Sequence, residues 1–534
     1  MESMTYLDCY ASVGKWPGKD PAAPWTVEEM LADMARCGIH GALIFSNFAR
    51  ALEPSVGNQQ VSDICAQHPR LFPCWVGLPH TGGEAPRGRE FVELARAKGV
   101  RAVKIFPKLH HFLVNKRTLG DLLAALEAAE MPLLVDAGHY EPYNQIGWDE
   151  VEWLVKTYPT LPVLLHSVRW EATRFLLPLL RAFPNLHVEF SNYQANRIIE
   201  FLVEQIGPEQ LLFGTEMMQK SPGAAKAFVD YAEIDDSARR KIAGENLIRL
   251  LKLPEIPPEY APTSGDDAIL ARAKQGAPID DMEVIDGHAH ISEKGHSDIV
   301  IAVMPKADAA GVVERNARIG VDKTCASGWA GVWTDYAIGN ETVGQAIQDF
   351  PEKIVGYATL DPLYVTDWEN ELKHCYEELG MRGMKPYYPR NKIPYNARAY
   401  EKWFAYGNRH RLFALMHPSD NFVTEMEDLA PRYPDISFLL AHSGWSYEVA
   451  RRHARLAQKF PNVFCEITFT SVTNGVIEFL VREVGSEKVI YGSDTSMRDP
   501  IPQFGWVAYA DISETDKRNI LGRNMRKILD RCRF

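Results

Sequence analysis

The most constraining feature of this sequence is an internal repeat, in which the second half follows the first at an offset of about 280 residues. Eight segments of the first half recur in the same order in the second half, among them FPNLHVEF and FPNVFCEI, and LLFGTEM and VIYGSDT. A shared order at nearly constant spacing indicates a duplicated domain. The chain is therefore expected to fold as two domains of the same kind.

Most of the repeated segments are short apolar runs of Val, Ile, Leu and Phe, separated by amphipathic stretches such as 121–130 and 447–459. Apolar strands that alternate with helices are typical of a parallel sheet covered on both faces. No GxGxxG motif follows the first strand, which disfavours an open dinucleotide-binding sheet. Eight strands per domain favour a barrel, so we predict an α/β protein with two tandem (β/α)8 TIM-type barrels. In the second half the strands are expected near 284–285, 323–326, 354–359, 381–385, 412–416, 436–441, 463–467 and 489–491.

The boundary between the two domains is expected in the segment LPEIPPEYAPTSGDDA, which is rich in Pro, Ser and Gly and lacks apolar periodicity. We place the first barrel at 1–253, a linker at 254–281 and the second barrel at 282–534. The two barrels are expected to pair within one chain, and further homo-oligomers are possible.

Composition narrows the class of function. The net charge is −12 and no basic block is present, which argues against a nucleic-acid partner. Neither a leader with a basic and an apolar region nor an apolar run approaching 18 residues is present, so a cytoplasmic protein without a membrane span is expected. The eight cysteines form no CxxC pair, which disfavours a thiolate metal cluster. A small-molecule substrate is the expectation that remains.

The run VIDGHAHI carries two imidazoles, His288 and His290, two residues apart after an apolar stretch. Residues i and i+2 of a strand point to the same face, so both rings can reach one metal ion. In a barrel of this kind the carboxyl ends of the strands meet at one mouth, which is expected to add His417, His442 and Asp494. Imidazoles with one carboxylate suit a divalent, zinc-like ion with a position left open for water.

The motifs DGHAH, LAHSG and YGSD make the second half resemble the amidohydrolase superfamily, in particular the amidohydrolase 2 branch, which includes metal-dependent decarboxylases. The resemblance implies one divalent metal, zinc or alternatively manganese, bound by His288, His290, His417 and Asp494. It also implies that His442 orients or polarises the substrate and that Asp494 takes a proton from the metal-bound water. Lys385 stands where some relatives carry a carbamylated lysine between two metals, and its alternative is a buried structural lysine.

The first half lacks most of these ligands. It carries Tyr10 and Ser12 in place of the histidine pair, so we predict a non-catalytic barrel. His139 leaves open an activity without a metal there, since some relatives hydrolyse lactones in that way. By register, the six positions of the degenerate site are Tyr10, Ser12, Lys104, Asp136, His166 and Glu216.

The leading functional prediction is a hydrolase in which a metal-activated water attacks a small amide, ester or lactone. A decarboxylase of the same branch is the alternative enzyme, and a binding or scaffold protein is the alternative from another class. Arg498 is a candidate for holding a substrate carboxylate through its planar guanidinium. Trp329 and Trp445 are candidates for walls around a planar substrate.

Overall fold

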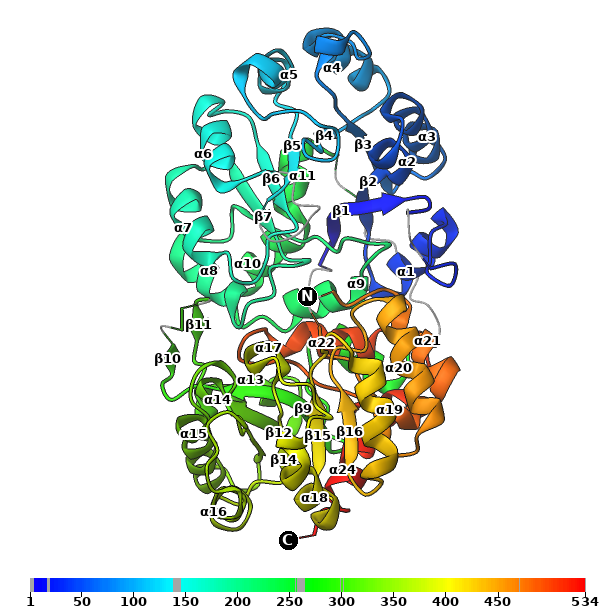
Figure 1. Ribbon diagram of the computed structural model, residues 1–534. Coiled ribbons are helices and arrows are strands. Elements are labelled where there is room, and N and C mark those ends of the chain that lie inside the picture. Colours follow the sequence, from blue (N-terminus) through cyan, green and yellow to red (C-terminus); the bar gives the residue numbers. More distant parts are fainter. Residues whose placement is uncertain are drawn as a thin grey trace. The chain divides into compact units, whose positions relative to one another are not determined.

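The chain forms two barrel units, seen in the computed structural model of Figure 1, which describes residues 4–533 except 17–19, 138–145, 255, 257–264, 298, 301 and 470. One compact unit comprises 1–265 with 301–303, and the other comprises 266–300 with 304–534. Each unit contains one sheet of eight parallel strands in sequential order, alternating with helices, which confirms the predicted pair of TIM-type barrels. The segment 254–281 includes helix α12 (Ala268–Lys274), which belongs to the second unit.

The first barrel closes where β1 meets the chain after β8. The backbone N–H of Cys9 donates to the carbonyl of Phe213 at 3.0 Å, and that of Ser12 donates to Met217 at 2.7 Å. Its strands are β1 Leu7–Val13, β2 Gly41–Ser46, β3 Leu71–Val76, β4 Ala102–Lys104, β5 Leu133–Asp136, β6 Val163–His166, β7 Leu186–Glu189 and β8 Leu211–Leu212. Its helices are α1 Val27–Cys37, α2 Asn47–Ala51, α3 Pro54–Gln67, α4 Gly88–Ala97, α5 Lys116–Ala129, α6 Trp148–Thr157, α7 Thr173–Ala182, α8 Ile198–Ile206, α9 Pro222–Asp230, α10 Asp236–Arg240 and α11 Asn246–Leu251.

The second barrel closes in the same way, because the N–H of Gly287 donates to the carbonyl of Tyr491 at 2.9 Å. Its strands are β9 Val284–Ile291, β12 Val321–Gly328, β13 Ile354–Ala358, β14 Gly383–Met384, β15 Phe413–Met416, β16 Ser437–Leu440, β17 Val463–Glu466 and β18 Val489–Ile490, and a short antiparallel pair, β10 His296–Ser297 and β11 Met304–Pro305, follows β9. Its helices after α12 are α13 Ala309–Ala317, α14 Trp329–Trp333, α15 Tyr336–Asp349, α16 Trp368–Lys373, α17 Tyr388–Asn391, α18 Glu401–His410, α19 Phe422–Arg432, α20 Tyr447–Lys459, α21 Val476–Val484, α22 Pro500–Ala508, α23 Glu514–Arg518 and α24 Asn524–Leu529.

The strands are buried on both faces, which explains why they read as continuous apolar runs rather than alternating ones. All four residues of β15 are buried, and all four of β16 as well. Inside the second barrel, Ile285, Phe413 and Leu439 belong to one apolar cluster. Polar residues therefore gather at the carboxyl ends of the strands, where the apolar interior stops. Among the described residues, no helix is both long enough and apolar enough to cross a membrane.

Candidate metal centre

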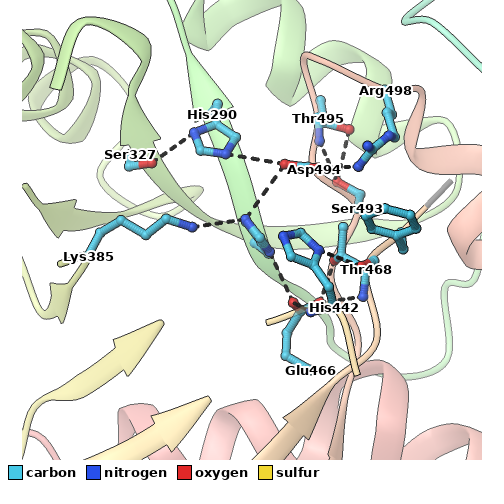
Figure 2. A network of polar contacts seen from close by, with 12 residues as sticks. His290, Ser327, Lys385, His442, Glu466, Thr468, Ser493, Asp494, Thr495 and Arg498 are labelled. Atoms are coloured by element: carbon cyan, nitrogen blue, oxygen red, sulfur yellow. Dashed lines mark hydrogen bonds and ion pairs between the residues drawn. The ribbon is translucent and has the colours of Figure 1, made fainter. Parts of the chain in front are cut away.

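Three of the predicted ligands converge at the mouth of the second barrel (Figure 2). Oδ1 of Asp494 lies 3.2 Å from Nε2 of His290 and 3.6 Å from Nε2 of His288. Donor atoms bonded to one ion at about 2.1 Å are about 3.0 to 3.4 Å apart at octahedral or tetrahedral angles. All three side chains are buried. The donor set therefore fits one divalent metal ion.

Both histidines of the pair are oriented by a partner behind them. Nδ1 of His288 donates to Oε2 of Glu466 at 3.0 Å, and Nδ1 of His290 lies 2.9 Å from the hydroxyl of Ser327. A histidine that donates from Nδ1 presents the lone pair of Nε2, which is the form that binds a metal. Burial, together with the charge of Lys385, holds the pKa of His288 well below its usual value. The ring is therefore neutral at physiological pH.

His442 and His417 lie beside this set. Nδ1 of His442 donates to the carbonyl oxygen of Thr468 at 2.7 Å, so its Nε2 carries a lone pair. Burial lowers the pKa of His442 to about 3. The ring of His417 is centred 4.9 Å from that of His442. Among the described residues the two clusters with ligand spacing are His288, His290 and Asp494, and His288, His442 and Glu466, so His417 stands outside both.

Two cations border the donor set. Nζ of Lys385 lies 3.0 Å from Nε2 of His288, and Nη1 of Arg498 donates to Oδ2 of Asp494 (Figure 2). Burial lowers the pKa of Lys385 to about 8. Burial raises the pKa of Asp494, but Arg498 and the histidine pair outweigh this effect and hold it well below its usual value. Asp494 is therefore an ionised carboxylate, as a metal ligand must be.

Aromatic side chains form the surroundings of the set. Trp329 stacks on His290 with ring centroids 4.5 Å apart, and Trp445 stacks on Phe469 at 4.8 Å. The guanidinium of Arg498 lies over the ring of Phe469, 5.0 Å from its centroid. Trp445 is 49% exposed, so it stands at the rim, whereas Trp329 is buried.

Sequence reasoning missed two buried carboxylates that support the site. Asp286 accepts from the backbone N–H groups of His288 at 3.1 Å and Ser493 at 3.0 Å, and so joins the first strand to the chain after the last one. Glu466 orients His288 as described above. The first barrel retains both, as Asp8 and Glu189. A signal was present in the repeat, because these carboxylates persist in both halves although the metal ligands do not.

In the first barrel an ion pair stands among the equivalent positions. Nζ of Lys104 lies 2.6 Å from Oδ1 of Asp136 and 3.1 Å from Nδ1 of His166. The ring of Tyr10 stacks on His166 with centroids 4.2 Å apart. Within the described part of the first barrel, no group of histidine, cysteine and carboxylate side chains has ligand spacing. Ser12, another of the six positions equivalent to the metal centre, is buried on β1.

The register of one predicted position is wrong. The sequence comparison put His166 in the place of His442, whereas the structure puts Ser167 there. Ser167 and His442 both have a positive φ, of 56° and 64°, and each donates its backbone N–H to the carboxylate that ends the seventh strand. His166 thus lies one residue earlier, in the place of Ala441. Glu216 does match Asp494 in its positive φ of 56°, and it accepts from Nδ2 of Asn192 at 2.7 Å. His139 lies outside the described residues.

Solved structures with a similar fold each match about one barrel. A TIM-barrel protein from Bordetella bronchiseptica is 13% identical, with a TM-score of 0.38, over 47% of this chain and 99% of its own. 2,6-Dihydroxybenzoate decarboxylase from Rhizobium is 15% identical, with a TM-score of 0.37, over 47% and 99%. 4-Oxalomesaconate hydratase from Rhodopseudomonas palustris is 18% identical, with a TM-score of 0.36, over 46% and 96%. These likenesses concern the fold and say nothing about the activity of this chain.

Among curated proteins, none matches the chain significantly. The family described as Amidohydrolase matches twice, at residues 11–253 and at residues 285–531. The two matches together span most of the chain and correspond to the two barrels. The chain therefore belongs to the amidohydrolase family, as a tandem duplication of its barrel.

Proposed function

We propose that the second barrel is a metal-dependent lyase that removes carbon dioxide from a small, planar carboxylic acid. The observation that carries this proposal is the meeting of cations and an aromatic face at the donor set. Arg498 contacts Asp494 and also lies over the ring of Phe469, and Lys385 contacts His288. Two cationic side chains and a divalent ion outweigh the carboxylates of Asp494 and Glu466 and leave the mouth positive, which suits an anionic, unsaturated or aromatic substrate.

Two features favour decarboxylation over the hydrolysis that the sequence suggested first. His442 donates from Nδ1 to Thr468, so its Nε2 accepts hydrogen bonds and has no hydrogen with which to polarise a substrate carbonyl. Arg498 pairs with Asp494 and makes that carboxylate a weak base for deprotonating water. Both observations weaken the roles that a hydrolytic mechanism would give to these residues.

The residues of the site have the following proposed roles. His288, His290 and Asp494 would hold the ion, which when bound supplies positive charge for a substrate oxygen and a water of lowered pKa. Arg498 binds the substrate carboxylate, and Trp445 with Phe469 orients the planar body at the rim. Lys385 holds a proton on Nζ beside the donor set and is the group proposed to protonate the carbon that loses carbon dioxide.

A paired assay tests this proposal. The purified chain, loaded with zinc or with manganese, is incubated with a panel of aromatic and unsaturated acids and, separately, with neutral amides, esters and lactones. We expect carbon dioxide release from at least one acid, lost in the His288→Ala, His290→Ala double variant, and a raised KM in Arg498→Gln. Hydrolysis of a neutral substrate without any carbon dioxide release would restore the hydrolase assignment. A chain that binds no metal after reconstitution would support a scaffold role instead.

The first barrel is proposed to lack metal chemistry. A chain of residues 266–534, which keeps α12 in the unit to which it belongs, provides the direct test, because it should retain the metal site if the first barrel contributes no ligand. Metal content by mass spectrometry of both chains measures this.

A further inference from the structure

The hydroxyl of Tyr387, at the mouth of the second barrel, has no partner within the described part of the chain. Tyr387 follows the end of β14 by three residues and is half-buried. Its oxygen makes no hydrogen bond to another described residue and is not one of the buried polar atoms that lack a partner, so part of its surface is accessible. The neighbouring tyrosines differ, because Tyr388 donates to Oδ2 of Asp420 at 2.6 Å and Tyr395 donates to the carbonyl of His417 at 2.8 Å.

The ring of Tyr387 is held beside the donor set. It meets the ring of His417 in a T-shaped contact, with centroids 5.3 Å apart. Nζ of Lys385 lies 5.8 Å from the centroid of Tyr387 and 3.0 Å from Nε2 of His288. The ring thus borders the space next to Lys385, where the proposed function places the reacting carbon.

The hydroxyl of Tyr387 lies among the charges of the same site. Burial raises the pKa of Tyr387 to about 12, the charge of Asp494 adds to this rise, and Arg390 and Arg498 oppose it. Because Coulomb interactions weaken with distance, the influence of Asp494 and Arg498 indicates that the hydroxyl lies on the side of the donor set. A phenol with this pKa keeps its proton at physiological pH, so the hydroxyl is available to donate.

The first barrel carries the same ring without the hydroxyl. The matched segments GVRAVKIFP and GMRGMKPYYP put Lys104 in the position of Lys385 and Phe106 in the position of Tyr387. Nζ of Lys104 lies 5.3 Å from the centroid of Phe106, which closely repeats the 5.8 Å between Lys385 and Tyr387. Packing at this position therefore needs only the ring.

The hydroxyl occurs in the half of the chain that retains the histidine pair, and it is absent from the half that has lost the pair. A tyrosine oxygen that is partly withdrawn from water usually finds a hydrogen-bond partner. Since no described residue fills that role for Tyr387, the available acceptor is a molecule that enters the mouth of the second barrel.

We propose that the hydroxyl of Tyr387 donates a hydrogen bond to an oxygen of the substrate bound at the donor set. This inference rests on the proposed function of the second barrel, to which it adds a residue that contacts the substrate. The ring of Tyr387 packs against Nζ of Lys385, as the ring of Phe106 does against Lys104. The hydroxyl then orients the substrate on the side of Lys385.

Tyr387→Phe tests the proposal, because it removes one oxygen and keeps the ring that fits this position in the first barrel. Salicylate is the probe, and calorimetry of the metal-loaded full chain measures its dissociation constant. The binding that counts is the part lost in the His288→Ala, His290→Ala variant. We expect about tenfold weaker binding in Tyr387→Phe, as for the loss of one hydrogen bond to a charged acceptor. Metal affinity and the thermal unfolding midpoint should equal those of the parent, because the hydroxyl makes no hydrogen bond to another described residue. Tyr364→Phe removes the hydroxyl of a tyrosine that is 69% exposed in the same unit and should bind salicylate as the parent does.

Turnover separates this inference from the proposed lyase activity. Weaker salicylate binding in Tyr387→Phe, without carbon dioxide release from any acid, would keep Tyr387 as a contact residue and reject the lyase. Carbon dioxide release together with equal salicylate binding by the parent and Tyr387→Phe would keep the lyase and overturn the inference. Absence of saturable salicylate binding by the metal-loaded parent at millimolar concentration would also overturn it.

Discussion

Glu466→Gln is expected to weaken metal binding in the second barrel by ten- to a hundredfold, although Glu466 need not touch the metal. Oε2 of Glu466 accepts from Nδ1 of His288 at 3.0 Å and from the backbone N–H of His442 at 3.4 Å. Oε1 accepts from the backbone N–H of Thr468 at 2.7 Å. Whichever way the glutamine amide is turned, its NH2 group therefore faces at least one N–H donor.

The magnitude follows from that mismatch. Leaving a buried donor unsatisfied costs about 1 to 3 kcal/mol. If the His288 ring turns so that its N–H finds another acceptor, the same free energy is lost from metal binding. Each 1.4 kcal/mol corresponds to about a factor of ten in metal affinity. This agrees with the ten- to hundredfold effect typical of groups that orient a ligating histidine.

The assay is a metal titration of the purified chain in competition with a chelating dye at pH 7.5. Glu189→Gln is the matched control, because Glu189 ends the seventh strand of the first barrel and accepts from the N–H of Ser167 at 3.1 Å. We expect metal affinity to fall in Glu466→Gln and to stay unchanged in Glu189→Gln. Equal affinities in the parent and Glu466→Gln, or an equal loss in both variants, would refute the role given to Glu466.

Three further predictions address stability. Burial lowers the pKa of His453 from 6.5 to about 3, so the neutral ring stabilises the fold fully above pH 6.5 and this stabilisation is lost as the pH falls toward 3. At pH 5 the free energy of unfolding should be lower by roughly 2 kcal/mol, and urea titrations should show His453→Gln less acid-sensitive by that amount. Arg315 and Asp499 form a fully buried ion pair, with Nη2 of the arginine 2.7 Å from Oδ2 of the aspartate. Arg315→Met should destabilise the chain by about 3 to 5 kcal/mol, because it leaves the Asp499 charge buried and unpaired. The Arg315→Met, Asp499→Leu double variant should lose less stability in the same urea assay. Removing the metal with a chelator should lower the thermal unfolding midpoint of the parent and leave that of the His288→Ala, His290→Ala variant unchanged, and a shift in both would place the metal elsewhere.

Much of the architecture was predictable because barrel strands are recorded in the sequence as local patterns. Runs such as that of β15 are buried on both faces and read as continuous apolar segments, and the repeat supplied each of them twice. The closeness of His288 and His290 was predictable for the same reason, since both lie on one face of β9. Strand ends alone also indicated that Asp494 would lie near this pair, whereas His417 lies outside the two clusters with ligand spacing among the described residues.

The sequence by itself thus determined two barrels, and it predicted which of them carries the histidine pair. Only the tertiary structure decided how the polar groups are hydrogen-bonded. Glu466 reaches His288 across 178 residues of sequence, and Thr468 sets the tautomer of His442. The physical reason is that apolar burial follows short-range periodicity, whereas a hydrogen bond depends on distance and direction between groups that folding brings together from separate strands.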